Sequence, residues 1–337
     1  MFANFFFMPA RGPCTLAGIA VLCAAMLCGP VQAAGLTVLL ADDLAAHAEF
    51  VRQLRDGQER GNRFELVRLG GAGAALATAE GTGADDDHPL AGVRTRGLRS
   101  EPAADSAVTV AVGIDAARSA IERPGQDPLV LAMLTRLDYE SLKGNPALRR
   151  GERRVGVLLR DPAMADQLAL IDAVLPQKRR LGVVATAESE PLLRELRRVA
   201  QGWDVQVEYA PDAQSLAGVL RLLVPRSDAL LVLPDLIGDN QAATLSVLRA
   251  AAGAGLPVFG ASEGLVRSGG LAAAVSTPGQ LARQARALAQ KVAAGNGSVL
   301  VEAATPASVR VNATVARGLG LHLPEERELT DRVLAAR

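Results

Sequence analysis

The sequence contains few cysteine, histidine and aromatic residues. Its three cysteines, Cys14, Cys23 and Cys28, all lie close to the N-terminus, so the rest of the chain can form no disulfide bond. The three histidines are scattered, and we expect no metal site. Aromatic residues make up 3% of the chain, which disfavours a sugar site built on stacked rings. Stability must therefore come from apolar burial.

An excess of charge of one sign is also missing. The chain has 36 lysines and arginines against 36 aspartates and glutamates, and no basic patch indicates nucleic-acid binding. The glycines at Gly71 and Gly73 lack the third glycine of a dinucleotide-binding fingerprint, so we expect no cofactor. Hydrophobic residues reach 49%, and 337 residues exceed the usual size of one domain. We therefore expect two lobes.

Residues 1–34 have the order of a secretory signal peptide. Arg11 precedes an apolar run over 14–28, and small residues follow at Ala33 and Ala34. The run is shorter than the ~20 residues that a membrane-spanning helix needs. We expect cleavage near Ala33 or Ala34 and a freely soluble protein in the periplasm.

Short apolar runs alternate with helical patterns along the remaining sequence. Continuous apolar runs are typical of strands that are covered on both faces, and their alternation with helices favours a parallel sheet. The predicted fold is α/β, with two Rossmann-like lobes that each hold a mainly parallel sheet flanked by helices. Between these patterns, residues 70–107 read as a surface loop. The predicted strands are 36–41, 64–67, 108–112 and 128–133 in the first half, and 180–186, 205–209, 228–235 and 257–261 in the second.

Three further strands are expected to carry the chain from one lobe to the other. They cover 153–160, 271–275 and 299–303, and together they predict a three-segment hinge. The predicted domains are a signal peptide at 1–34, an N-terminal lobe at 35–157 plus 276–298, a C-terminal lobe at 158–275 plus 299–325, and a C-terminal tail at 326–337.

The order of motifs over residues 150–323 resembles a known family. The motifs are a helix that ends in proline (167–176), then DALLVLPD (228–235), LPVFG (256–260), LVRSGG (265–270) and VNATVARGLGL (311–321). In this order they resemble the substrate-binding proteins of ABC transporters, with the type I periplasmic binding fold. The resemblance implies two lobes that close on a small-molecule ligand, an ABC permease in the inner membrane as partner, and no catalytic residues. We expect a monomer.

Polar side chains at the carboxyl ends of the predicted strands are the candidate ligand contacts, because these ends of a parallel sheet border a crevice. Arg136 is expected to bind a ligand carboxylate through its planar fork of donors. Asp42, Asp115 and Thr186 also precede helices and have N-capping as an equally favoured role. The candidates are Asp42, Asp43, Asp115, Thr135 and Arg136 in the first lobe, Thr186, Glu188, Asp235, Ser262 and Glu263 in the second, and Ser276 at a crossing.

Two other functions stay open at this point. GASEG at 260–264 has the spacing of a hydrolase nucleophile, with Ser262 as nucleophile and Glu302 and His322 following in the order of a triad. Only a few residues separate it from the next glycines, which leaves little room for the helix that such a site requires. The second alternative is a ligand-independent scaffold for envelope proteins on the same fold. We favour a non-enzymatic solute-binding protein.

Overall fold

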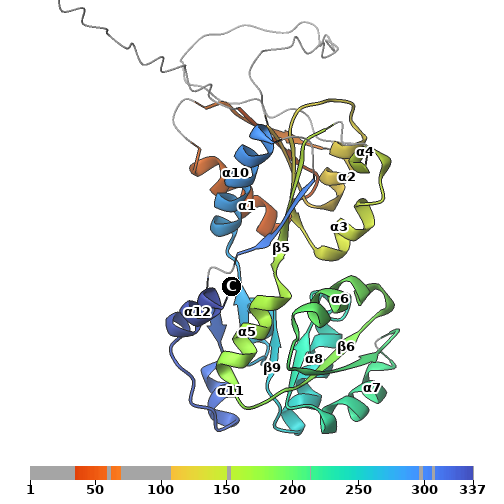
Figure 1. Cartoon of the computed structure of the whole chain (residues 1–337), viewed down its shortest axis with the longest axis vertical. Coiled ribbons are helices and arrows are strands. Elements are labelled where there is room, and N and C mark those ends of the chain that lie inside the picture. The colour runs from red at the N-terminus through yellow and green to blue at the C-terminus, as the bar shows by residue number, and fades with distance from the viewer. Residues whose placement is uncertain are drawn as a thin grey trace, which may run out of the picture. The chain divides into compact units, whose positions relative to one another are not determined.

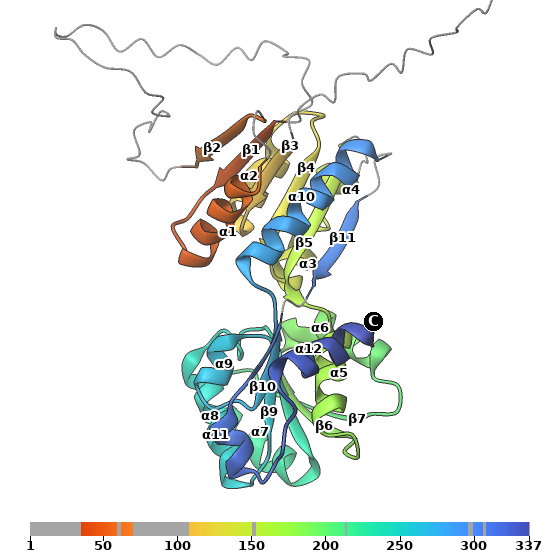
Figure 2. The same cartoon turned by 90° about the vertical axis from the view of Figure 1, so that its left-hand side faces the viewer.

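The described part of the chain forms two sheets of six strands, each with helices on both faces (Figures 1 and 2). The computed structural model describes residues 35–58, 62–69, 108–149, 153–212, 214–295, 299–305 and 308–336. The predicted signal peptide at 1–34 and the predicted loop at 70–107 lie outside these ranges. Within them, no helix is both long enough and apolar enough to cross a membrane.

The first sheet is entirely parallel. Its strands are β1 (Leu36–Leu40), β2 (Phe64–Arg68), β3 (Val108–Val112), β4 (Leu129–Leu134), β5 (Val155–Pro162) and β11 (Leu300–Ala304). They lie in the order β11-β5-β4-β3-β1-β2, and every pair runs parallel. Its helices are α1 (Ala45–Asp56), α2 (Ile114–Glu122), α3 (Arg136–Leu142), α4 (Pro146–Arg149) and α10 (Pro278–Ala294).

Both faces of the first sheet are covered over its central strands, which explains the apolar runs of β1, β3 and β4. Val38 and Leu40 point to one face, where they pack with α1 and α10, two helices that lie side by side (Figure 2). Leu39 points to the opposite face, where it packs with α2, α3 and α4. Because successive side chains of a strand point to opposite faces, a strand buried on both sides must be apolar at every position.

The second sheet repeats this plan with one antiparallel strand at its edge. Its strands are β6 (Arg180–Ala185), β7 (Asp204–Tyr209), β8 (Ala229–Val232), β9 (Val258–Gly260), β10 (Ala272–Val275) and β12 (Ser308–Val311). They lie in the order β12-β10-β9-β8-β6-β7, and only the β12–β10 pair is antiparallel among the described pairs. Its helices are α5 (Met164–Val174), α6 (Glu190–Val199), α7 (Leu216–Leu223), α8 (Gln241–Gly253), α9 (Glu263–Arg267), α11 (Ala313–Gly318) and α12 (Glu326–Ala335), with 3-10 turns η1 (Ala187–Ser189) and η2 (Val224–Arg226).

The helices of the second sheet also divide between two faces. Helices α5, α6, α11 and α12 pack with Leu181 and Val183 on one face, and α7, α8 and α9 pack with Val184 and Leu230 on the other. The sequence pattern of α6 is confirmed, since Leu192 and its apolar neighbours are buried while the arginines of the helix face solvent.

The chain passes between the two sheets three times. It crosses after β5 into α5, after β10 into α10, and from β11 to β12. All described residues belong to one compact unit. The predicted architecture of two α/β lobes with three connecting segments is confirmed.

The strand pairing differs from the predicted domain boundaries at two places. β5 continues in the first sheet to Pro162, beyond the predicted boundary at 157, and there it pairs with β4 as far as Leu159 and with Ala304 of β11 at Pro162. β11 pairs with β5 in the first sheet, whereas the sequence predicts residues 299–325 in the C-terminal lobe. The third crossing therefore lies after Ala304.

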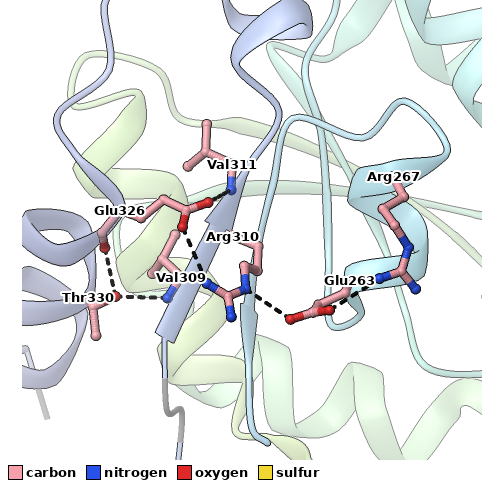
Figure 3. Close-up of polar contacts among 7 residues, drawn as sticks. All are labelled: Glu263, Arg267, Val309, Arg310, Val311, Glu326 and Thr330. Carbon is pink, nitrogen blue, oxygen red and sulfur yellow. Dashed lines mark hydrogen bonds and ion pairs between the residues drawn. The ribbon is translucent and has the colours of Figure 1, made fainter.

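The predicted C-terminal tail, 326–337, contains helix α12, which is part of the second lobe. Leu329 and Val333, one helical turn apart, are buried in its core. Thr330 Oγ1 accepts the backbone N–H of Val309, and Glu326 Oε1 accepts that of Val311, each at 2.8 Å (Figure 3). Four residues of helix advance ~6 Å and two residues of strand ~7 Å, so the two acceptors match the two donors. Helix α12 thereby covers the outer edge of β12.

Candidate functional site

A cavity of about 660 Å³ is lined by residues of both lobes. The first lobe contributes the end of β4, the end of β5 and the beginnings of α1 and α10. The second contributes the residues that follow β8, β9 and β10. The cavity therefore lies at the carboxyl ends of parallel strands, where the sequence places the ligand site. Its polar lining residues are Arg160, Asp161, Asp239, Gln241, Thr244, Ser262, Glu263, Ser268, Ser276 and Thr277.

Three of the eleven predicted contacts line this cavity: Ser262, Glu263 and Ser276. Ser262 is the N-cap of α9, where its Oγ accepts the N–H of Leu265 at 3.1 Å. Ser276 Oγ donates to the carbonyl of Thr305 at 2.6 Å and so joins two of the crossings. Both hydroxyls have structural roles beside the cavity, and each can still accept a hydrogen bond from a ligand.

Glu263 belongs to a charged network that reaches α12 (Figure 3). Its Oε1 accepts from Arg310 at 2.9 Å, and its Oε2 accepts from Arg267 at 3.2 Å. Arg310 also bonds Glu326 at 3.3 Å, so one guanidinium joins the cavity wall to the C-terminal helix. The Arg310 guanidinium is the main reason that the pKa of Glu263 lies below its ordinary value. Both carboxylate oxygens of Glu263 are therefore already paired.

The predicted aspartates of the first lobe do not line the cavity. Both oxygens of Asp42 lie about 3 Å from Nδ1 of the buried His47, at 2.9 and 3.0 Å. Gly113 makes room for this ring, because a Cβ at its φ of +81° would lie 2.7 Å from the imidazole. Asp43 pairs with Arg68 on the surface, and Asp115 is exposed in the first turn of α2.

Thr135 and Arg136 lie at the start of α3, outside the cavity lining. The Thr135 side chain and Asp138 form a reciprocal capping box, with hydrogen bonds of 3.0 and 2.8 Å. The Arg136 guanidinium pairs at 2.9 Å with Glu195, which also accepts the N–H of Met164. The structure thus gives Arg136 a carboxylate partner on α6 of the other lobe, in place of a ligand.

The predicted residues that follow β6 and β8 form a buried network in the second lobe. Asp235 is 1% exposed and accepts the Ser189 hydroxyl at 2.5 Å and the N–H groups of Ile237 and Gly238 at 2.9 and 3.1 Å. Burial raises the pKa of Asp235, and these hydrogen bonds oppose the rise. Thr186 caps η1 through Ser189, and Glu188 is exposed. This network shapes the loop whose residues Pro234 and Gly238 line the cavity.

Sequence reasoning missed the charged residues at the end of β5. Asp161 lines the cavity, with its side chain 13% exposed, and Arg160 lies 3.7 Å from it and 3.6 Å from Asp239. The Oδ2 atom of Asp161 is buried and has no hydrogen-bond partner among the described residues. Burial raises the pKa of Asp161 to about 6. The signal in the sequence was the charged pair that directly follows an apolar strand.

The backbone of Met133, which lines the cavity, has a strained conformation. Its φ is +61°, the only positive value at a non-glycine residue in the described ranges. The register between β4 and β5 shifts between Ala132 and Leu134, so Met133 is a bulge that lines the cavity. A side chain in the left-handed region costs roughly 1–3 kcal/mol, and such strain is concentrated at functional sites.

The residues of the cavity favour binding over bond chemistry. Ser262 Oγ has no hydrogen bond to a histidine within the described part of the chain, and α9 after it is only five residues long. The described residues also bring together no group of three or more side chains that could hold a metal ion. What the cavity offers is hydroxyl, amide and carboxylate groups, which are suited to a polar solute.

Comparisons with solved structures support the fold. A conserved domain protein from Vibrio cholerae is 21% identical, with a TM-score of 0.52 over 90% of this chain and 98% of that chain. A substrate-binding protein with adhesive properties from Clostridium difficile is 17% identical, with a TM-score of 0.58 over 86% and 95%. An ABC domain from Streptococcus pneumoniae, solved with L-tryptophan, is 17% identical, with a TM-score of 0.50 over 87% and 96%. At these identities the likeness shows the fold alone.

The sequence itself identifies the family. No curated protein sequence matches the chain. The family model of the ABC transporter substrate-binding proteins matches residues 104–330, which is more than half of the sequence and spans both sheets. Together with the two lobes and the cavity between their strand ends, this match shows that the chain belongs to the ABC transporter substrate-binding protein family.

Proposed function

We propose that this chain is a periplasmic solute-binding protein that holds a small polar or amino-acid-like ligand in the cavity between its lobes. The observation that carries the proposal is a cavity of about 660 Å³ with polar side chains from both lobes. Pockets for small molecules commonly measure ~300–1,000 Å³. The periplasmic location follows from the signal peptide expected at 1–34, and the partner would be an ABC permease in the inner membrane.

Binding would act through lobe closure. A ligand that contacts Asp161 in the first lobe and Ser262 in the second interacts fully only when both are near it, so it favours the closed arrangement over the open one. The three crossings, at β5, β10 and β11, are the segments that would bend. No bond chemistry is required, and we propose that the protein is not an enzyme and acts as a monomer.

The amino-acid class is the first to test. Among the structural relatives, the pneumococcal protein was solved with L-tryptophan. The cavity here has hydroxyl donors at Ser262 and Thr277 that suit a carboxylate, and a carboxylate at Asp161 that suits a donor. These residues make up the ligand site in our proposal, with Thr244 and Gln241 as further contacts.

A pair of glycine substitutions tests the proposed site. Gly264 lines the cavity, and a Cβ there would meet only Ser262 Oγ at 3.7 Å, so Gly264→Trp places an indole in the cavity without a backbone clash. Gly253→Trp, at the end of α8 with open space around it, is the matched control. The measurement is the shift in thermal unfolding with a panel of amino acids and other small metabolites.

A ligand at 100 times its dissociation constant should add about 2.7 kcal/mol to the stability of the wild type and of Gly253→Trp, and nothing to Gly264→Trp. The absence of any shift in the wild type would favour the alternative of a ligand-independent scaffold. Turnover of a chromogenic ester that is lost in Ser262→Ala would favour the other alternative, a serine hydrolase.

A further inference from the structure

A second pocket, which we call the outer pocket, lies in the first lobe at the amino ends of β4 and β5. Its volume is about 400 Å³. Leu129, at the start of β4, lines the outer pocket, whereas Met133, near the end of β4, lines the cavity between the lobes. Val155 and Asp161 of β5 are divided in the same way. Six residues of strand extend ~20 Å, so the two spaces are separate.

The outer pocket has an apolar floor and a stiff wall. The wall is the segment 123–126, in which Pro124 has a fixed φ. A volume of about 400 Å³ is within the ~300–1,000 Å³ that is usual for small-molecule sites. The floor residues pack in one core of the first lobe and are Ile121, Leu129, Leu148 and Val155.

The guanidinium of Arg153 is held in place beside this floor. Its Nε donates to the carbonyl of Asp127 at 2.6 Å, and its Nη1 donates to the carbonyl of Ala120 at 3.0 Å. No described residue accepts a hydrogen bond from its Nη2. Partial burial lowers the pKa of Arg153, and the charge of Asp127 opposes this shift. A partly desolvated guanidinium with free N–H groups in a fixed orientation is suited to binding an anion.

The charge of the outer pocket is opposite in sign to that of the cavity between the lobes. Arg123 and Arg153 line the outer pocket, and neither forms an ion pair with a carboxylate in the described ranges. Glu122, which is exposed, is the acidic residue in the described lining. The described lining of the cavity between the lobes has three carboxylates and one arginine, Arg160. The outer pocket therefore favours an anion, whereas the cavity does not.

We propose that the outer pocket is a second binding site, which takes a small organic anion with an apolar group. The acidic group of the ligand accepts hydrogen bonds from the free N–H groups of Arg153 and from Arg123, and its apolar group lies on the floor. A carboxylate matches the planar fork of a guanidinium. This inference concerns a different site from the proposed solute cavity and does not depend on it.

Matched pairs of probes test the need for an anionic group. The fluorescent compounds 1-anilinonaphthalene-8-sulfonate and N-phenyl-1-naphthylamine have the same rings, and only the first has an acidic group. Fluorescence titration of the folded protein gives the affinity and the stoichiometry for each. Competition by 4-phenylbutyrate and by 4-phenyl-1-butanol makes the same comparison for a carboxylate.

Two tryptophan substitutions locate the probe. Gly125 lines the outer pocket, its φ is not positive, and a Cβ there would meet no atom within 4 Å, so Gly125→Trp places an indole in this pocket without a backbone clash. Gly264→Trp, which places an indole in the cavity between the lobes, is the matched control. Arg123→Gln removes one guanidinium of the outer pocket, and Arg118→Gln, exposed on α2, is the control for loss of one positive charge.

The wild type should bind one equivalent of the sulfonate at least tenfold more tightly than the neutral amine, and 4-phenylbutyrate should displace it more readily than the alcohol does. Affinity for the sulfonate should fall at least tenfold in Gly125→Trp and at least threefold in Arg123→Gln. Gly264→Trp and Arg118→Gln should leave it unchanged. Arg123 is substituted rather than Arg153 because Arg153 also holds the carbonyls of Asp127 and Ala120.

The contrary outcomes are equally specific. Failure of the wild type to bind either anion, equal affinity for the charged and the neutral probes, or unchanged affinity in Gly125→Trp would reject the outer pocket as an anion site. Loss of binding in Gly264→Trp alone would place the probe in the cavity between the lobes and would also reject the inference. The thermal panel tests the solute-binding function separately, so failure of one proposal is distinguishable from failure of the other.

Discussion

The two lobes have the same architecture but differ in whether the acidic side chains at their strand ends have hydrogen-bond partners. In the second lobe, Asp235 has three hydrogen bonds and Glu263 has two arginine partners. In the first lobe, Asp161 borders the same cavity with a buried oxygen that has no partner among the described residues. At the strand ends, therefore, Asp235 and Glu263 of the second lobe are paired, and Asp161 of the first lobe keeps an oxygen without a partner within the described ranges. In our proposal, Asp235 and Glu263 have a mainly structural role and Asp161 is a ligand contact.

The edges of the two sheets differ in a similar way. The edge strand β12 of the second sheet has two of its N–H groups bonded to side chains of α12 (Figure 3). The edge strand β2 of the first sheet is mostly exposed, and the ion pair of Asp43 with Arg68 lies at the surface beside it. Covered edges protect a sheet from pairing with other chains, so α12 contributes both stability and protection.

The largest expected effect comes from breaking the satisfied network of the second lobe. Asp235→Ala removes the acceptor for the Ser189 hydroxyl and for two backbone N–H groups, all of them buried or partly buried. We expect a loss of about 4 kcal/mol in the free energy of unfolding, measured by urea denaturation. Asp235→Asn keeps one carbonyl oxygen and should lose clearly less. Equal losses in the two variants would show that the hydrogen bonds are not the cause.

The second-largest effect is expected from Asp161→Asn in the first lobe, which should gain stability relative to the wild type as the pH rises. The ordinary pKa of an aspartate is 3.8, and that of Asp161 in the folded protein is about 6. As the pH rises from about 4 to about 6, the unfolded chain loses this proton first, so the folded wild type loses up to about 3 kcal/mol relative to a variant without the carboxyl.

The free energy of unfolding of Asp161→Asn minus that of the wild type should therefore be larger above about pH 6 than below about pH 4. Urea denaturation at both pH values measures this, without a ligand. A difference between the two proteins that does not change with pH would contradict the account of a buried, unpaired carboxylate.

The third effect sharpens the contrast between the edges. Thr330→Val keeps the shape of the side chain and leaves the N–H of Val309 without its acceptor, so we expect a loss of about 1 kcal/mol in the free energy of unfolding. Thr314→Val, at an exposed position in α11, is the control and should change little. Similar values for both variants would mean that α12 does not stabilise the edge through this bond.

The smallest effect is expected at the exposed edge of the first sheet. Asp43 and Arg68 have side chains that are 84% and 55% exposed, and solvent screens such a pair. Asp43→Asn should change the free energy of unfolding by less than about 0.5 kcal/mol, as measured by denaturation at low and high salt. A loss well above that value, removed by salt, would show that this edge depends on the ion pair.

The fold could be predicted from the sequence because local patterns encode it. Unbroken apolar runs such as 129–134 indicated strands covered on both faces, and the alternation with helices indicated parallel sheets. The pairing of β11 with the first sheet could not be predicted, because it depends on which strand edge is free after the chain crosses. Similarly, nothing local to residues 326–335 indicates that two of its side chains match the N–H groups of β12.

The site was predicted less completely, for a physical reason. Sequence shows which polar residues follow strands, and it placed Ser262, Glu263 and Ser276 at the cavity. It does not show which of them have partners, because Arg136 and its partner Glu195 are distant in the sequence. Asp161 was missed because it directly follows the strand 153–160, which was predicted to cross between the lobes and not to border the cavity.

The most direct test of the central claim is a crystal structure of the protein with the compound that gives the largest thermal shift. The account predicts that this compound lies in the cavity lined by Asp161 and Ser262 and contacts both lobes. A compound bound outside the cavity, or bound to only one lobe, would contradict it.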